Sequence, residues 1–195
     1  INQPWFYLPN QFWAHKNHSV VIEALNILKK QGNNFLVVAT GSIEDSRNKR
    51  YFPSLIKKIK DYNLQDNFRI LGMIPFPDVI ALMQHSIAVI NPSLFEGWST
   101  PVEESKALGK VIILSNIPVH KEQSPDRGCF FDPSDYEQLA RTMKEVWKKY
   151  NLIEEKFYYD KAQSEYCLNR AKFAKQYEHI CNSVIEEHRK INEFY

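Results

Sequence analysis

Short apolar runs alternate with longer amphipathic segments along most of this chain. Runs rich in Val, Ile, Leu and Phe predict strands that are buried on both faces. The predicted strands are 5–8, 35–39, 68–71, 86–90, 111–114 and 128–131. Helical spacing of apolar residues predicts helices after a cap at Ser19 and over 47–62, 78–84, 101–108, 117–122 and 134–149. This alternation predicts an α/β fold, a Rossmann-like parallel sheet with helices on both faces.

The pattern changes after Tyr150, where strand-like runs end. The segment 154–192 is charged, dotted with aromatic residues and helical in period, so we expect one or two C-terminal helices. We therefore divide the chain into a Rossmann-like domain, 1–150, and a helical extension, 151–195. The chain begins with Ile rather than Met. We expect it to be a piece of a longer protein, and the extension to pack either on this domain or on that absent part.

Composition places the chain among ordinary globular proteins, with 195 residues, 44% hydrophobic and 25% charged. Its 25 basic and 23 acidic residues are well mixed, which argues against nucleic-acid binding. Cys129, Cys167 and Cys181 form no CxxC pair, and an odd count favours the reducing cytoplasm over a disulfide framework. No apolar run approaches the roughly 20 residues of a membrane-spanning helix.

A basic cluster near position 147 leaves two interpretations open. Lys144, Lys148 and Lys149 accompany Trp147 and Tyr150 at the end of a predicted helix. Such a cluster fits a solvated helix face, and it also fits a peripheral contact with anionic lipid at the inner face of the membrane.

The most informative segment joins a predicted strand to a predicted helix and carries Glu96 and Glu104. Thr100 is the expected cap and Pro101 the first helical residue. Both carboxylates are expected to face the crevice at the carboxyl edge of the sheet, where open α/β folds bind ligands. Because carboxylates accept hydrogen bonds, this pair suits a ligand with several hydroxyl groups.

The turn between the two carboxylates offers backbone N–H groups of Ser99, Thr100 and Val102 at a helix N-terminus, a position that attracts anions such as a diphosphate. Two hydroxyl binders around a phosphate cradle describe a nucleotide-sugar site. The spacing alone leaves a second interpretation open. Thr100 and Glu103 have the spacing of a capping box, in which case Glu96 and Glu104 would only be solvated.

A second polar group, His15-Lys16-Asn17-His18, follows the first predicted strand and therefore lies at the same sheet edge. A Lys at this place can put a point charge on a diphosphate. The alternative is an exposed basic loop.

These residues resemble a known family. Glu96 and Glu104, with Pro92-Ser93 and Phe95 before them and 105–109 (Ser-Lys-Ala-Leu-Gly) after, resemble the E-x7-E signature of family-4 retaining glycosyltransferases. His15-Lys16-Asn17 and the segment 116–122 resemble further segments of that family in the same order. The resemblance covers residues 5–150 and implies the donor-binding, C-terminal half of a GT-B fold, without the N-terminal acceptor-binding half.

The resemblance also implies roles for individual residues. Glu96 would contact the donor sugar, Glu104 the ribose, and Lys16 the diphosphate of the departing nucleotide. Family members usually pair this Lys with an Arg a few residues earlier, where this chain has Asn10 and Gln11. The family generally holds the diphosphate without a cation, and no metal-ligand spacing is present, so we expect no metal and no cofactor.

Other residues are assigned with two interpretations each. Met73 and Ile74 stand where the family holds the nucleobase, but a Gly-Pro turn after a strand is common in α/β folds. Gly41 indicates either a close approach of the backbone to the ligand or a turn. Gly97 belongs to the donor-binding motif, whereas Trp98 beside it is expected to be a packing residue. His120 and Glu122 are expected on the surface of a short helix, although Glu122 matches a family position near the donor.

The resulting hypothesis is the donor-binding domain of a retaining glycosyltransferase. It would take a sugar from a nucleoside-diphosphate-sugar to a glycan or lipid-linked acceptor in polysaccharide biosynthesis, and it would be inactive without its acceptor domain. The alternative is a non-catalytic nucleotide-sugar-binding module, a scaffold or sensor, which the missing Arg keeps open. Sugar-nucleotide epimerases and phosphorylases share the fold, but the flanking pattern of the Glu pair argues against both.

Overall fold

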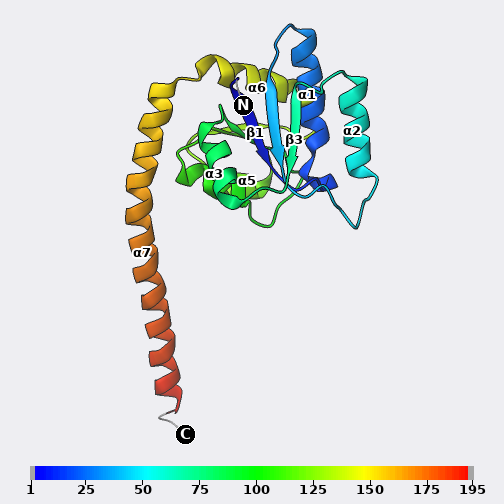
Figure 1. The fold of residues 1–195 in the computed structure, drawn as a ribbon. Coiled ribbons are helices and arrows are strands. Elements are labelled where there is room, and N and C mark those ends of the chain that lie inside the picture. The colour runs from blue at the N-terminus through cyan, green and yellow to red at the C-terminus, as the bar shows by residue number, and fades with distance from the viewer. Residues whose placement is uncertain (1–2, 193–195) are drawn as a thin grey trace.

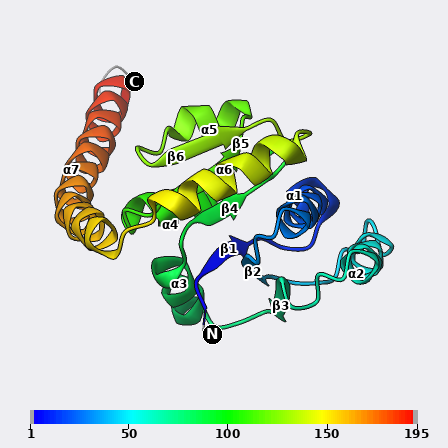
Figure 2. The ribbon, with the colours of Figure 1, turned by 90° about the horizontal axis from the view of Figure 1, so that it is seen from above.

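The fold is built on one parallel sheet, seen in a computed structural model that describes residues 3–192. Figure 1 shows the fold, and the strand order β3-β2-β1-β4-β5-β6 can be followed in Figure 2. The strands are β1 (Trp5–Pro9), β2 (Leu36–Thr40), β3 (Phe68–Gly72), β4 (Val89–Asn91), β5 (Ile112–Ser115) and β6 (Gly128–Phe131). All six predicted strands are confirmed, although β4 begins three residues later than predicted.

Helices cover both faces of the sheet (Figure 2). The helices are η1 (Ala14–Lys16), α1 (His18–Lys30), α2 (Tyr51–Asp61), α3 (Phe76–His85), α4 (Thr100–Ala107), α5 (Pro118–Gln123), α6 (Tyr136–Lys149) and α7 (Leu152–Asn192). Apolar residues of α1, α2 and α6 form the larger core on one face, and those of α3 and α4 form a smaller core on the other. The predicted fold class is confirmed.

The side chains of β1 alternate between the two faces of the sheet and therefore contribute to both cores. Phe6 and Leu8 belong to the larger core, and Tyr7 between them belongs to the smaller one. Alternate side chains of a strand point to opposite faces, so a fully buried strand must be apolar on both. That is why β1, β2, β4 and β5 appear in the sequence as continuous apolar runs rather than as alternating ones.

Two predicted helix caps are wrong, and α2 begins at Tyr51, four residues later than predicted. Helix α1 begins at His18 after Asn17, whose backbone is left-handed, and Ser19 accepts a hydrogen bond from Lys58 instead of capping the helix. Helix α4 begins at Thr100 with Ser99 as its cap, so the predicted Thr100 cap and its capping box do not form. The Glu103 carboxylate instead accepts hydrogen bonds from the side chains of Gln123 and Lys106.

The C-terminal extension is one helix, α7, of which only the beginning packs on the domain. Glu155 is paired with Lys110 and Arg127, and the Gln163 side chain donates to the Ala107 carbonyl at 2.8 Å. The described contacts of α7 with the Rossmann-like domain therefore lie near its start. Residues 1–2 and 193–195 of the proposed division lie outside the described part.

A glycine permits this contact. Gly109 has φ of +60°, and a Cβ built there would lie 2.2 Å from the Tyr158 carbonyl oxygen. Any side chain at position 109 would therefore displace α7 and strain the backbone.

The aromatic residues of the basic cluster belong to the interior. Trp147 stacks on Phe35 with ring centroids 4.5 Å apart, and Trp147 and Tyr150 both pack against the larger core. The Trp147 ring is therefore turned away from any lipid surface, and only Lys148 and Lys149 of the cluster are exposed. None of the described helices is long and apolar enough to span a membrane.

We predict that Glu155→Ala lowers the free energy of unfolding by about 3 kcal/mol, because it leaves the Lys110 ammonium buried without its partner. Burial already lowers the Lys110 pKa, which shows the cost of desolvating this charge. Urea denaturation measures the difference. Glu154→Ala, at the exposed neighbouring position, is the matched control and should change stability by less than about 0.5 kcal/mol. Equal effects of the two substitutions would contradict the anchoring role.

Candidate functional site

The site lies where the strand order of the sheet reverses. Strands β2 and β3 extend from one side of β1, and β5 and β6 extend from the other side of β4. The loops that follow β1 and β4 therefore diverge and leave a crevice at the carboxyl edge, the usual ligand position in open α/β sheets. These loops, 10–17 and 92–99, contain most of the residues that the sequence singled out.

Direct contacts connect the two loops. The Leu94 N–H donates to the His15 carbonyl at 2.8 Å, and the His15 ring stacks on Phe95 with centroids 4.6 Å apart. The Asn17 side chain donates to the Pro92 carbonyl at 3.1 Å. The backbone positions of Lys16 and Glu96 are thereby fixed relative to each other.

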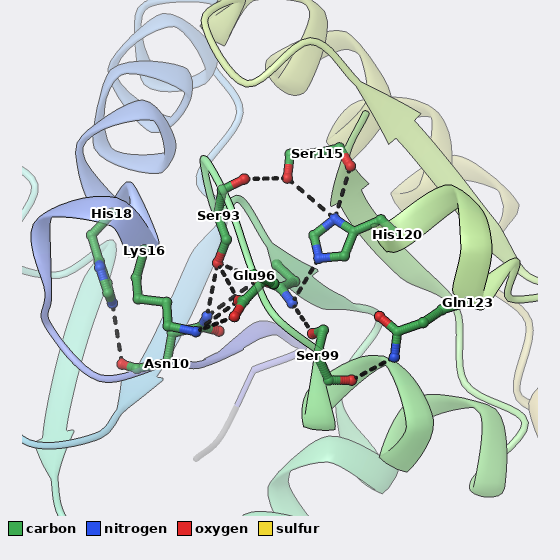
Figure 3. A network of polar contacts seen from close by, with 10 residues as sticks. Asn10, Lys16, His18, Ser93, Glu96, Ser99, Ser115, His120 and Gln123 are labelled. Atoms are coloured by element: carbon green, nitrogen blue, oxygen red, sulfur yellow. Dashed lines mark hydrogen bonds and ion pairs between the residues drawn. The ribbon is translucent and has the colours of Figure 1, made fainter. Parts of the chain in front are cut away.

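Lys16 and Glu96 form an ion pair (Figure 3). The Lys16 Nζ lies 2.7 Å from Glu96 Oε1 and 2.8 Å from Oε2, and the Ser93 hydroxyl lies 2.7 Å from Oε1. Only 13% of the Lys16 side chain and 8% of the Glu96 side chain are exposed. Two residues that are 80 positions apart are thus joined, but their roles in a reaction stay predictions.

A buried polar network lies behind this pair, centred on Asn91 at the end of β4 (Figure 3). The Asn91 amide nitrogen donates to Ser99 Oγ at 2.6 Å and lies 3.4 Å from His120 Nε2. Its amide oxygen accepts from Asn10 at 3.2 Å and from Ser93 at 2.9 Å. Asn91 therefore connects both loops and the starts of α4 and α5.

His120 completes the network and corrects a prediction. It was expected on the surface of α5 but is fully buried, and its Nδ1 donates to the Ser115 carbonyl at 2.8 Å. Burial lowers the His120 pKa, so the ring is neutral and Nε2 can accept a hydrogen from Asn91. Asn91 and Ser115, which the sequence analysis missed, could have been found because each is the polar last residue of an apolar strand.

Glu104 lies in a separate cleft of about 210 Å³ at the same edge. The cleft is lined by residues from the ends of β1 to β3 and from α3 and α4, namely Pro9, Gln11, Thr40, Gly41, Met73, Ile74, Phe76, Val79, Thr100, Pro101 and Glu104. Burial raises the pKa of Glu104 above its usual range. The cleft therefore combines one partly desolvated carboxyl group with a largely apolar wall.

Tyr7 lies beneath the cleft, where its hydroxyl is 2.7 Å from Thr40 Oγ1. Burial raises the Tyr7 pKa to about 12, and the nearby Glu104 carboxylate adds to this effect. Tyr7 is therefore neutral and orients Thr40, one of the polar groups of the cleft.

Several predicted donor-binding residues contact the protein itself. The Asn10 amide donates to Asn91, and Gln11 accepts from the Ser42 N–H. The Val102 N–H donates to the Ser99 carbonyl at 3.2 Å, so Val102 does not offer it to an anion as predicted. Ser99 is buried, and its hydroxyl accepts a hydrogen bond from the Asn91 amide. Thr100, in contrast, is exposed and lines the cleft.

The two motif residues Gly97 and Trp98 face outward. Gly97 is exposed, with open space around a built Cβ, and Trp98 is 55% exposed, so its assignment to packing is wrong. Gly41 has φ of +132°, and a Cβ there would lie 2.5 Å from the Asn10 carbonyl oxygen. The close approach at Gly41 is therefore to the loop after β1, which brings that loop to the cleft wall.

A larger cavity of about 720 Å³ lies elsewhere, between α4, the turn before β6 and the start of α7. It shares no lining residue with the Glu104 cleft. The four cations of its lining are all paired, Lys110 and Arg127 with Glu155, Lys106 with Glu103 and Lys161 with Glu165. Within the described part of the chain, no group of three or more His, Cys, Asp and Glu residues is arranged to hold a metal ion.

His18 contradicts the interpretation of its loop as an exposed basic segment. It is fully buried, stacks on Phe12 with centroids 4.3 Å apart, and its Nε2 lies 3.2 Å from the Asn10 carbonyl oxygen. Burial lowers its pKa from 6.5 to about 3. Between about pH 3 and pH 6.5, therefore, the His18 ring binds a proton in the unfolded chain but not in the folded one.

We therefore predict that His18 makes the protein less stable as the pH is lowered. The free energy of unfolding should decrease by about 1.4 kcal/mol for each pH unit between about pH 6.5 and 3. The sign follows because a lowered pKa in the folded state leaves more protons on the unfolded one. Between pH 7 and pH 5, wild type should lose about 2 kcal/mol more than His18→Gln in urea denaturation. His179→Gln, on the exposed part of α7, controls for loss of an imidazole. Parallel losses in wild type and His18→Gln would refute the prediction.

Comparison with known proteins gives a consistent result. A family model described as "Glycosyl transferases group 1" matches residues 2–163. The O-antigen chain mannosyltransferase RfbU of Salmonella typhimurium is 25% identical over 142 residues, which cover 73% of this chain and 38% of that protein.

Solved structures share the fold. A glycosyltransferase from Rickettsia africae superposes with a TM-score of 0.71 and 25% identity, covering 83% of this chain and 42% of that one. Anabaena HepE in complex with UDP and glucose superposes with a TM-score of 0.65 and 16% identity, covering 75% and 39%. The chain thus spans about two fifths of the length of these proteins.

The family expected from the residues is confirmed at this level, since the family model covers the whole sheet and the first turns of α7. The chain belongs to the glycosyl transferases group 1 family, and its Rossmann-like domain has the fold found in GT-B glycosyltransferases.

Proposed function

We propose that this chain is the donor-binding domain of a retaining glycosyltransferase that passes a sugar from a nucleoside-diphosphate-sugar to a glycan or lipid-linked acceptor in cell-surface polysaccharide synthesis. The observation that carries the proposal is the meeting of the Lys16–Glu96 pair and the Glu104 cleft at one sheet edge. The names of the relatives support it, since one is an O-antigen chain mannosyltransferase and another was solved with UDP and glucose.

In this proposal the Glu104 cleft takes the nucleoside. The ionised Glu104 carboxylate accepts hydrogen bonds from the two ribose hydroxyls, and the apolar wall around Met73 and Ile74 contacts the base. Because burial raises the Glu104 pKa, protonation would weaken ribose binding at a higher pH than for an exposed carboxylate.

Lys16 takes the diphosphate while it continues to hold Glu96. An ammonium group has three donors, and Lys16 directs its Nζ to both oxygens of Glu96. One donor remains for a phosphate oxygen, beside the N–H of Thr100 at the start of α4. The protein then contacts the diphosphate through the Lys16 ammonium and the N-terminus of α4.

The transfer breaks the bond between the sugar C1 and the phosphate oxygen, and the electron pair leaves with the nucleoside diphosphate. Lys16 stabilises the negative charge that develops on that oxygen. The acceptor hydroxyl forms the new bond to C1, and its proton passes to the departing phosphate oxygen. Glu96 is held by Lys16 and Ser93. Its carboxylate faces the sugar and accepts hydrogen bonds from the sugar hydroxyls. The acceptor site lies on a segment outside this chain, so the chain should bind a nucleoside diphosphate but transfer nothing alone.

We predict that Glu104→Ala weakens binding of the preferred nucleoside diphosphate about tenfold or more, because two hydrogen bonds to a charged acceptor are lost. Calorimetry with UDP, GDP and ADP in EDTA-containing buffer identifies the base and measures the loss. Glu145→Ala, an exposed Glu on α6, is the matched control and should bind like wild type. Wild-type affinity in Glu104→Ala would sink the ribose assignment.

A second prediction separates the diphosphate from the nucleoside. Lys16→Ala should weaken nucleoside diphosphate binding by about tenfold or more, since it removes a cation and leaves Glu96 unpaired near the phosphates. It should leave the weaker binding of the free nucleoside unchanged, and Lys16→Arg should retain most of the diphosphate affinity. Equal losses for both ligands would show that Lys16 supports the fold rather than the phosphates.

One observation favours the alternative of a non-catalytic binding module. Asn10 and Gln11, at the place of the family's Arg, bond to Asn91 and Ser42, so neither supplies a second charge for the phosphates. A donor-hydrolysis and transfer assay, with the acceptor-binding half on the same polypeptide, decides between the two. Nucleotide binding without any turnover would favour the sensor or scaffold.

A further inference from the structure

The distal part of α7 projects away from the sheet (Figure 1). From Ser164 to Arg189 every residue is exposed except Ser183, which is half-buried. Large apolar side chains nevertheless recur there. Five of them, each between 51% and 66% exposed, share one face of the helix and are called the seam: Tyr166, Phe173, Tyr177, Ile180 and Val184. Leu168 and Ile185 are also exposed but lie off this face.

The spacing of the seam is that of a coiled coil. Successive members are seven, four, three and four residues apart, which places them on one helix face. The rings of Phe173 and Tyr177 already stack along this face, with centroids 6.2 Å apart. An apolar stripe of this kind is normally buried against another helix.

The seam also carries two charges, at positions that continue the same spacing. Arg170 lies four residues after Tyr166, and Glu187 lies three residues after Val184. The apolar stretch from Phe173 to Val184 is thus bounded by a cation at one end and an anion at the other.

These charges distinguish the ways in which two copies of the helix can pair. In a parallel, in-register pair, Arg170 would face Arg170 of the second copy, and Glu187 would face Glu187. In an antiparallel pair centred between residues 178 and 179, Phe173 faces Val184 and Tyr177 faces Ile180 of the second copy. The same register places Arg170 opposite Glu187 twice, which is the complementary arrangement.

The flanks of the seam suit this register. Ala174 and Cys181 occupy one flank, and Gln176 and Ser183 occupy the other. In the antiparallel register Ala174 lies across from Cys181 of the second copy, and Gln176 across from Ser183. All four side chains are uncharged, so the helices can approach without repulsion along either flank.

We propose that the distal part of α7 is a dimerisation surface, which pairs with the same segment of a second copy as an antiparallel coiled coil. The apolar seam supplies the attraction, and Arg170 and Glu187 set the antiparallel direction.

Charge reversal tests the proposal in the 195-residue chain by sedimentation equilibrium. Arg170→Glu and Glu187→Arg should each weaken self-association about tenfold or more, because each creates two like-charge contacts. The double variant Arg170→Glu/Glu187→Arg should regain the wild-type affinity. A mixture of the two single variants should form heterodimers, since each then meets its opposite charge at both ends.

Lys172→Glu and Glu186→Lys are the matched controls, because they reverse neighbouring charges that lie off the seam. They should dimerise like wild type, and circular dichroism verifies that all variants are folded. A wild-type chain that stays monomeric at about 0.5 mM, far above typical complex affinities, would overturn the proposal and assign the seam to another partner. A double variant as weak as the single ones would overturn the antiparallel arrangement.

Crosslinking tests the register independently. Positions 174 and 181 also lie about 10.5 Å apart along one helix, so the variant Ala174→Cys/Cys181→Ser is mixed with the wild-type chain, and each chain then carries only one of the two cysteines. A short bifunctional maleimide should join Cys at position 174 of the variant to Cys181 of the wild-type copy, and mass spectrometry would identify this intermolecular link. Ala171→Cys, on the opposite side of the helix from the seam, is the control and should not crosslink across the dimer. Links between identical positions, 174 with 174, would indicate a parallel pair and refute the register.

Discussion

Buried polar groups must find hydrogen-bond partners inside the protein, and this constraint organises the carboxyl edge of the sheet. Asn91 ends an apolar strand and is fully buried, so both ends of its amide have to be satisfied. They are satisfied by Asn10 of the loop after β1, by Ser93 and Ser99 of the loop after β4, and by His120 of α5. Satisfying one buried amide therefore fixes the two loops and the start of α4.

The same constraint explains how the Lys16–Glu96 pair is arranged before any ligand binds. Two nearly buried charges are costly unless they are paired and hydrogen-bonded. Ser93 connects them to the network, because its hydroxyl contacts both Glu96 and Asn91. In the proposed function this preorganisation matters more than the strength of the Lys16–Glu96 ion pair itself. An ammonium group that is already oriented needs no rearrangement as charge develops on the leaving phosphate.

The strands were predictable because parallel strands covered on both faces must be apolar throughout, and β1, β2 and β5 are. Lys16 and Glu96 could be assigned to one sheet edge because both follow strands. The burial of His18 and His120 could not be predicted, since α5 has only six residues and α1 begins inside the loop packing. Burial at such positions depends on tertiary contacts, such as the stacking of His18 on Phe12, which leave no periodic signal in the sequence.

The C-terminal helix α7, unlike the helices of the domain, is exposed along most of its described length. The family model ends at residue 163, and the Gln163 side chain still donates to the Ala107 carbonyl of the domain. Before that point α7 is held by a buried charge cluster around Glu155, and beyond it the described side chains from Ser164 to Arg189 are exposed apart from Ser183. Most helical stability in proteins comes from packing of an apolar face rather than from intrinsic propensity. A helix that presents a regular apolar face beyond its own domain therefore gains its stability from a partner, and the charges at the ends of that face determine which orientation the partner can take.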